Sequence, residues 1–453
     1  MLDDEVPSFP LYITIPTWAA ILIPVLFWVW RLRDACAAFL LLATWCRYAM
    51  ATLHQYTYPP TILGLSPMAL SSLAIISVGV IVAAPRDLLL RRLLPIYGII
   101  TIILVSAAAN QTWVGAVNAT FKWAYLIVFA LAVYRAMQRC GPDQVCRALA
   151  VIYAAPIALQ WLSVPWGLKT MALDGTTFYI GGYESQQALS ITFLTFLVVT
   201  CFSSSLGAIA AFGRLGIVAV GLVLANYRTS ILAAALPAST LVISKLLSKF
   251  VPRQRLAAFM LLGVITAFAL VGFAVMEQQR FSDLGVIYDQ GAALVKPPSH
   301  FAPEDRRLLS GRLYLWSQYI NAYLEGDLVN AVIGFGPESW VGRFAMYAHN
   351  TFISYLYELG VIGLAAFLWL LGSNLRAAMR VRSDRKPILI ACHIGFIVLN
   401  LSTMAIWTLE GSILYALIIG HTWQLQSTKL VSTQIANARN GRLRLSQGIQ
   451  TLG

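Results

Sequence analysis

Long runs of apolar residues, separated by short polar segments, follow one another along almost the whole 453-residue chain. Most runs are roughly 16–23 residues long, the length that crosses a bilayer as an α-helix. The runs are solid rather than alternating, which excludes a transmembrane β-barrel and leaves helices as the spanning structure. The sequence therefore predicts an all-α fold, a polytopic membrane bundle of about 12–13 transmembrane helices. The predicted spans are residues 11–30, 35–50, 68–84, 93–109, 121–136, 148–164, 188–202, 206–225, 231–247, 256–276, 351–371, 387–407 and 412–423.

Two stretches are polar enough to lie outside the bundle. Residues 277–349 form one large extramembrane loop, and residues 427–453 form a basic tail that we expect to be cytoplasmic and disordered. Residues 1–426, with the loop included, are expected to make one integral membrane domain. Within the loop, apolar residues at 313, 316, 320 and 323 mark one face of an amphipathic helix that begins near Glu304. This face is predicted to lie on the membrane surface or on the bundle.

The charges give the predicted orientation of the chain. Only 11 % of the residues are charged, and the net charge of +13 is read as the excess of Lys and Arg on cytoplasmic loops, not as nucleic-acid binding. With an outside N-terminus and thirteen spans, one side carries 22 Lys and Arg against 4 Asp and Glu, and the other 10 against 15. Arg228, the 277–349 loop and His349 then fall on the non-cytoplasmic face. No ATP is available there, so a substrate would have to arrive activated, most plausibly on a lipid carrier.

His349 and Asn350 form a polar pair at the mouth of the apolar run 351–371. A histidine where a polar loop meets a membrane helix can be neutral near pH 7 and act as a base. On the residues alone, a hydrogen bond from His349 to a neighbouring loop carbonyl is the favoured alternative. Glu358 lies nine positions further on, about two and a half helical turns, and so faces away from His349. We expect it to be a buried structural glutamate or a second polar contact.

Two arginines are candidates for binding an anion. Arg228 stands at the end of two long apolar runs, where it either binds phosphate through its planar guanidinium or extends to lipid head groups. Arg312 lies in the predicted loop helix, where a solvated surface charge is the simpler alternative. The chain contains no HExxH motif, GxSxG motif or DxD pair, so no metal site is predicted.

These motifs together resemble the O-antigen polymerase and O-antigen ligase superfamily. Tyr227-Arg228-Thr229-Ser230 is similar to its "s-R-T/S" motif, and the segment from Ser310 to Trp316 is similar to its "sGR…W" motif. Gly334-Phe335-Gly336, followed by the segment His349 to Leu364, resembles its "GxG … HNxxLxxLxExGxxG" block. The resemblance covers roughly residues 225–371 and depends on the order and spacing of the motifs.

The resemblance implies a membrane glycosyltransferase of the C type in the bacterial inner membrane, with its active site facing the periplasm. It implies an undecaprenyl-diphosphate-linked oligosaccharide as donor and metal-independent, cofactor-free, inverting transfer to an acceptor glycan or to lipid A-core. Arg228 and Arg312 would hold the donor diphosphate and His349 would be the catalytic base, which fits the physical demands of the reaction. Asn350, Glu358 and Lys169 are candidate supporting residues. Membrane lipids, a chain-length regulator and a flippase are expected partners, and nucleic acid is not.

Polymerase and ligase share these arginines and the histidine, so the motifs do not separate them. The short segment between Arg312 and His349 leaves little room for a large acceptor-docking domain, which favours a polymerase of exopolysaccharide or O-antigen. An O-antigen ligase is the alternative. A lipid-linked glycan flippase or exporter is a remoter one, because such transporters often carry internal repeats and none is visible here.

Overall fold

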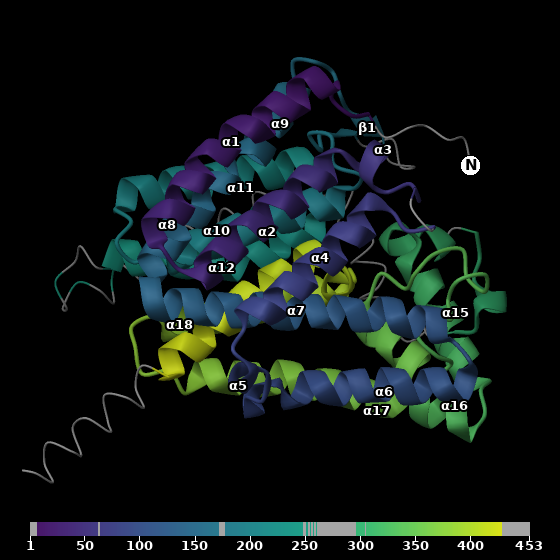
Figure 1. Ribbon diagram of the computed structural model, residues 1–453. Coiled ribbons are helices and arrows are strands. Elements are labelled where there is room, and N and C mark those ends of the chain that lie inside the picture. The colour runs from purple at the N-terminus through teal and green to yellow at the C-terminus, as the bar shows by residue number, and fades with distance from the viewer. Residues whose placement is uncertain are drawn as a thin grey trace, which may run out of the picture.

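The computed structural model describes residues 7–61, 64–171, 177–247, 296–303 and 305–427, together with residues 251, 254, 257 and 260. Its elements are almost all helices (Figure 1). They are α1 (Leu11–Leu32), α2 (Ala35–Thr52), α3 (His54–Thr57), α4 (Pro67–Val82), α5 (Pro85–Leu88), η1 (Arg91–Leu93), α6 (Leu94–Asn110), α7 (Trp113–Cys140), α8 (Pro142–Ile152), α9 (Ala154–Ser163), β1 (Thr170–Met171), β2 (Thr177–Phe178), α10 (Gln186–Phe202), α11 (Ala208–Ala225), α12 (Arg228–Leu247), η3 (Pro298–His300), η4 (Asp305–Gly311), α15 (Arg312–Leu324), α16 (Leu328–Ile333), α17 (Thr351–Met379), α18 (Lys386–Leu401), η5 (Ala405–Trp407) and a last helix over residues 409–427.

The all-α, polytopic membrane fold predicted from the apolar runs is confirmed. In the described part of the chain, eight helices are long and apolar enough to cross a membrane, and three further apolar helices are shorter. Every predicted span within the described residues coincides with a helix. The span predicted at 256–276, the beginning of the loop at 277–295 and the tail at 428–453 lie outside the described residues.

Several predicted boundaries were wrong. The fifth span, predicted at 121–136, is the longer helix α7 (Trp113–Cys140), and the eleventh continues past 371 to Met379. The sixth span begins at Pro142 rather than 148 and is divided into α8 and α9. The twelfth ends at Leu401, because residues 402–408 form turns around η5. The loop helix expected from Glu304 starts at Arg312, after the 3-10 helix η4. Hydropathy alone could not reveal the end at Leu401, since the apolar character resumes at residues 404–407.

The loop helix α15 packs on the bundle through a face next to the predicted apolar face. Its buried side chains are Leu315, Tyr319 and Ala322, and α15 packs with them against α17. On the predicted apolar face, Ile320 is exposed. The alternative in which this face lies on the membrane surface therefore stays a prediction.

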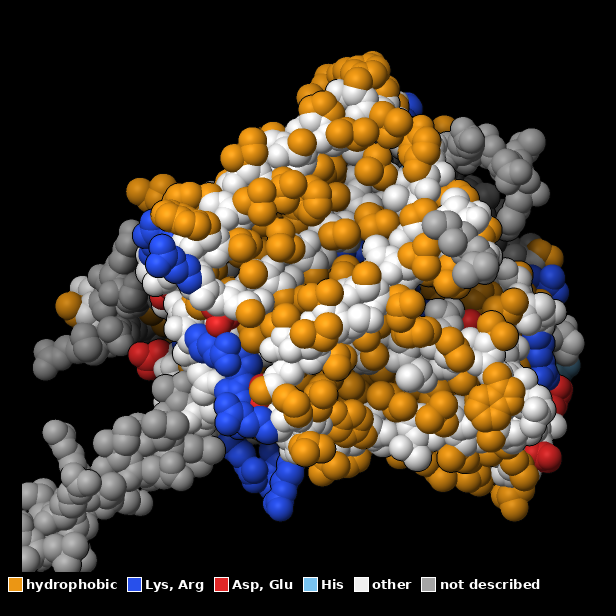
Figure 2. Space-filling model, in the orientation of Figure 1, with side chains coloured by type: hydrophobic (Ala, Val, Ile, Leu, Met, Phe, Trp, Pro, Cys, Tyr) orange, Lys and Arg blue, Asp and Glu red, His pale blue; other side chains and the backbone are white. Residues whose placement is uncertain are grey.

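The core of the bundle consists of helices that are apolar on every side. In α10 all the side chains from Leu189 to Phe202 are buried, and the hydroxyls of Thr192, Thr195 and Thr200 donate back to carbonyl oxygens of their own helix. Such internal bonding lets polar residues lie in an apolar interior without an unsatisfied group. The outer surface is covered by apolar side chains, and Lys and Arg gather towards the α5 end (Figure 2).

Two ion pairs lie inside the described part of the bundle. The buried Arg47 of α2 donates from Nε at 2.9 Å and from a terminal nitrogen at 2.6 Å to one carboxylate oxygen of Glu410, at the start of the last helix. Arg135 of α7 is paired with the buried Asp87 of α5. Charged groups in a membrane bundle are costly unless they are paired, so these pairs join helices that are distant in the sequence.

A glycine-rich turn is inserted into a break in α17. At Gly360 the helix leaves helical geometry, with φ of 67°, and the carbonyl of Glu358 is free to accept the Gly336 N–H at 2.9 Å. The approach is so close that a Cβ at Gly360 would lie 2.3 Å from the Val332 backbone oxygen. Gly360 in α17 and Gly334 in the turn allow this close approach because they carry no side chain. The break holds the turn beside α6 and α17, which run side by side along the lower edge of Figure 1.

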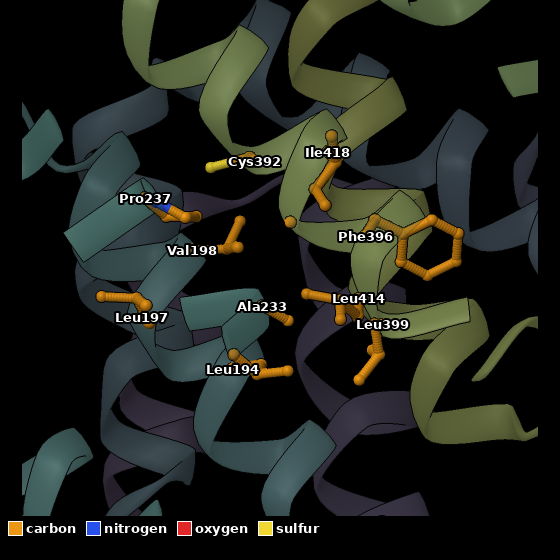
Figure 3. A pocket seen from close by; sticks show the side chains of 11 residues that line it. Leu194, Leu197, Val198, Ala233, Pro237, Cys392, Phe396, Leu399, Leu414 and Ile418 are labelled. Carbon is orange, nitrogen blue, oxygen red and sulfur yellow. The ribbon is translucent and has the colours of Figure 1, made fainter. Parts of the chain in front are cut away.

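An apolar cavity lies between α10, α12, α18 and the last helix (Figure 3). Leu197, Pro237, Cys392, Phe396 and Leu414 are among the residues that line it. No charged side chain reaches it, so it offers nothing to hold a diphosphate or a sugar. We regard it as a packing gap beside the proline of α12.

Candidate active site

Asn350 fixes the start of α17. Its Oδ1 accepts hydrogen bonds from the backbone N–H groups of Phe352 at 2.9 Å and Ile353 at 3.1 Å. These bonds satisfy groups that the first turn of a helix leaves without partners. The Asn350 Nδ2 donates to the Leu401 backbone oxygen at 2.9 Å and so ties this turn to the end of α18. The described contacts of Asn350 therefore hold in place the segment that carries His349.

His349 has a left-handed backbone conformation, with φ of 50°. For an L-residue this conformation costs roughly 1–2 kcal/mol, and it persists only where the surroundings enforce it. Both sequence neighbours of His349 are fixed. Asn350 has an extended backbone, and the Ala348 backbone oxygen accepts a hydrogen bond from the Trp316 Nε1 at 2.8 Å. The imidazole packs against the ring of Tyr347, with the centroids 4.1 Å apart. The histidine is thus held in one orientation.

The two ring nitrogens of His349 differ in their surroundings. Nδ1 is buried and has no hydrogen-bond partner in the described part of the chain. Nε2 is not among the enclosed, unpaired atoms there, and no hydrogen bond joins it to a described residue. The hydrogen bond to a loop carbonyl, which the sequence favoured on the residues alone, is therefore not found. Nε2 is left open to an incoming group.

The environment keeps His349 neutral. Burial, and then the positive charge of Arg312, lower the pKa of His349 to about 4, from an ordinary value of 6.5. Both causes act against the charged imidazolium. Near pH 7 the side chain is therefore a neutral imidazole with one accessible nitrogen, which is the form that can accept a proton.

Arg312 lies within electrostatic reach of three aromatic side chains of the site. It is the first residue of α15 and follows Gly311, whose φ is 80°. Burial raises the pKa of Tyr227, and the charge of Arg312 opposes this rise. Burial, then Tyr227, raise the pKa of Tyr347 to about 12, and Arg312 opposes this rise. No ion pair or hydrogen bond joins the Arg312 guanidinium to another described residue, so within the described ranges its charge acts on His349 without a counter-ion.

Arg228 begins α12, directly after Tyr227. The turn before it is closed by Asn226 in a left-handed conformation, with φ of 52°. The Arg228 side chain is exposed and, among the described residues, has no acidic or hydrogen-bonding partner. Because Tyr227 is within reach of the Arg312 charge, the structure brings the two predicted arginine segments and His349 to one end of the bundle.

Two residues of this site were missed by the sequence reasoning. Tyr347 donates from its hydroxyl to the Gln187 Oε1 at 3.3 Å and covers one face of the His349 ring. Tyr347 is only two residues before the histidine, and an aromatic residue so close to a candidate base was a usable signal. Gln187 lies 160 residues away in the sequence at the start of α10, so only the fold reveals it.

The other two predicted supporting residues lie apart from His349. Glu358 is buried: its carboxylate accepts the Ser354 hydroxyl at 2.5 Å and the Glu338 backbone N–H at 2.6 Å. These contacts are those of a structural group that secures the turn inserted into α17. Lys169 is exposed just before β1, and no described contact connects it with the histidine.

This arrangement suits an anionic substrate and a proton transfer. Two arginines without counter-ions can hold a phosphate group, and a neutral imidazole can take a proton from a hydroxyl beside it. In the described part of the chain, no group of three His, Cys, Asp or Glu side chains is placed to hold a metal ion. The chemistry available to these residues is electrostatic stabilisation together with base catalysis.

A comparison with known protein families agrees with this geometry. Residues 191–368 match the family model described as O-antigen ligase. The matched region includes Arg228, Arg312 and His349, and it overlaps the segment 225–371 whose motifs carried the resemblance. The comparison with curated proteins gave no match. Residues 191–368 are therefore similar to the O-antigen ligase family, which supports the resemblance to the O-antigen ligase and polymerase superfamily that the motifs indicated.

Proposed function

We propose that this protein is a polysaccharide polymerase that extends exopolysaccharide or O-antigen repeat units on the periplasmic face of the inner membrane. The donor would be an undecaprenyl-diphosphate-linked oligosaccharide and the acceptor a second glycan. One observation carries the proposal: the charge of Arg312 acts on a neutral, oriented histidine and has no counter-ion among the described residues. Such a site is incomplete until an anion enters, and a glycosyl diphosphate would supply that anion next to the base.

The proposed reaction is a single displacement. The His349 Nε2 takes the proton from the acceptor hydroxyl as its oxygen forms a bond to the anomeric carbon. The bond from that carbon to the diphosphate oxygen breaks, and its electron pair leaves with the diphosphate. Arg228 and Arg312 would neutralise the charge that develops there, which is the largest demand of such a transition state.

The same arrangement would adjust the strength of the base. In the empty site the charge of Arg312 helps to lower the pKa of His349 to about 4. A bound diphosphate would offset that charge, so the pKa of His349 would rise when the donor is present. After the product leaves, the pKa would fall again and the imidazolium would lose its proton to water.

A ligase that transfers glycan to lipid A-core is the second candidate, since the matching family model is described as O-antigen ligase. The polymerase is preferred because the segment between Arg312 and His349 contains only α15, α16 and turns. Both helices pack against α17, so no separate docking domain is present between these residues.

The deciding experiment supplies the purified protein with a lipid-diphosphate-linked repeat unit, with and without lipid A-core. Longer lipid-linked chains are expected, and they would form without lipid A-core. Transfer that occurs only to lipid A-core would overturn the polymerase in favour of the ligase. No transfer to either acceptor, by protein that is folded and inserted, would contradict the proposed function as a whole.

A further inference from the structure

A groove that is lined by two arginines and an apolar wall lies at the opposite end of α17 from His349. It has a volume of about 560 Å³. Its lining includes Trp369, Gly372, Ser373, Arg376 and Arg380 of α17, and Gln426 of the last helix. α17 starts directly after the His349–Asn350 pair and ends at Met379, with Arg380 as its C-cap, so the groove lies along its C-terminal part and the candidate active site at its start.

The groove residues of α17 share one face of the helix. Trp369, Ser373, Arg376 and Arg380 are three or four positions apart, the spacing that aligns side chains along a helix. The opposite wall is fixed by two bonds between the helices. Gln426 Nε2 donates to the Ala377 backbone oxygen at 2.7 Å, and Trp423 Nε1 donates to Asn374 Oδ1 at 3.1 Å. The groove is therefore formed by two helices that are firmly joined.

The groove combines two cations with an apolar wall. Arg376 and Arg380 are exposed, one turn apart, and form no ion pair or side-chain hydrogen bond with any residue in the described ranges. Like charges at this spacing repel one another and favour a shared anion. Trp369 is 52 % exposed, and Leu368 and Ile362 continue an exposed apolar surface along α17 towards His349.

We propose that this groove binds an anionic glycerophospholipid of the inner leaflet, such as phosphatidylglycerol or cardiolipin. The phosphate would lie between Arg376 and Arg380, and an acyl chain would run past Gly372 and Trp369 along α17. The lipid, rather than a free phosphate, is the occupant because the cationic part continues into an apolar surface that faces the membrane. Basic pockets between transmembrane helices on the cytoplasmic side commonly hold such head groups.

Two variants test this site. Arg376→Gln with Arg380→Gln removes the charge. Gly372→Leu fills the groove without changing the charge, and a Cβ added there meets no atom within 4 Å. Arg31→Gln with Arg33→Gln is the matched control, because it removes the same charge from another loop assigned to the cytoplasmic side. All the substituted side chains are partly or fully exposed, so the proteins are expected to fold.

The experiment titrates cardiolipin into the detergent-purified full-length protein and follows the thermal midpoint and the bound lipid by native mass spectrometry. The wild-type protein and the control should retain cardiolipin and gain several degrees, whereas both groove variants should lose at least half of the gain and the bound lipid. Phosphatidylcholine and inorganic phosphate should give no shift. An equal shift in the groove variants, or a shift with phosphate or phosphatidylcholine alone, would overturn the proposal.

Discussion

Two polar centres nine residues apart, Glu358 and His349, have opposite surroundings. The Glu358 carboxylate is buried, and its acceptor oxygens receive hydrogen bonds from Ser354 and from the Glu338 backbone. His349 has a buried Nδ1 without a partner among the described residues and faces the charge of Arg312. A satisfied centre stabilises the fold and needs nothing further. A cation without a counter-ion beside a neutral base can instead be completed by an anionic ligand.

The arginines divide in the same way. Arg47 is buried and paired with Glu410, at 7 % and 2 % exposure, so its charge is satisfied within the bundle. Arg228 and Arg312 carry the same charge but have no carboxylate partner in the part of the chain that the structure describes. Since both kinds of arginine occur in one chain, the chain does pair its cations where they serve the fold. The unpaired ones are therefore the candidates for binding an anion.

The largest expected effect is that of His349→Asn. Asparagine tolerates the left-handed backbone conformation but cannot accept the acceptor proton, so turnover should fall by about 10²–10⁴-fold with the thermal midpoint unchanged. His300→Asn, at an exposed histidine of η3, is the matched control and should retain full turnover. Normal turnover of His349→Asn in a lipid-linked glycan transfer assay would exclude the histidine as the base.

Arg312→Gln should reduce turnover by about 10²–10³-fold, because one preorganised donor to the leaving diphosphate is lost.

Arg228→Lys should also be impaired, since an ammonium cannot make the planar two-pronged contact. The measurement is initial rate against donor concentration. Arg343→Gln removes an arginine that stacks on Phe335 and Phe344 instead, and it is the control for loss of charge. Near-normal rates in both Arg312→Gln and Arg228→Lys would show that these arginines do not bind the donor diphosphate and are ordinary surface charges.

Glu358→Gln sharpens the comparison from the other side. The amide oxygen of glutamine can accept only one of the two hydrogen bonds from Ser354 and the Glu338 N–H, and the amide NH₂ would face the other donor. The free energy of unfolding should therefore fall by about 1–3 kcal/mol. The thermal midpoint in detergent should fall, whereas turnover per folded molecule should stay within about threefold of wild type. A folded Glu358→Gln protein as inactive as His349→Asn would show that the two centres are not separate.

The helices and the cluster of motifs could be predicted from the sequence, because apolar run length and the order of Arg228, Arg312 and His349 are local features. The break at Gly360 could not, since the apolar run continues through it and only the inserted turn requires the left-handed glycine. The partnership of Gln187 with Tyr347 depends on packing between α10 and the loop before α17. These features belong to the assembled bundle and leave no local pattern.

The smallest expected effect is on pH dependence. A base must be neutral, so turnover should fall as the pH drops through the pKa of His349 and stay level above it. In the free enzyme that pKa is about 4. Donor diphosphate offsets the Arg312 charge, so the acid limb of kcat should lie about one pH unit above that of kcat/KM for the donor. Arg312→Gln should raise the acid limb of kcat/KM. If Arg312→Gln left the acid limb of kcat/KM unchanged, the Arg312 charge would not be what lowers the pKa of His349.

The most direct test compares donor binding with turnover in the His349→Asn protein. Binding of undecaprenyl diphosphate should match that of wild type, because the two arginines are unchanged, while transfer of glycan should be reduced by about 10²–10⁴-fold. Such a separation is what a base beside an arginine-held diphosphate requires. A loss of affinity as large as the loss of turnover, or unchanged turnover, would contradict the assignment of His349 as that base.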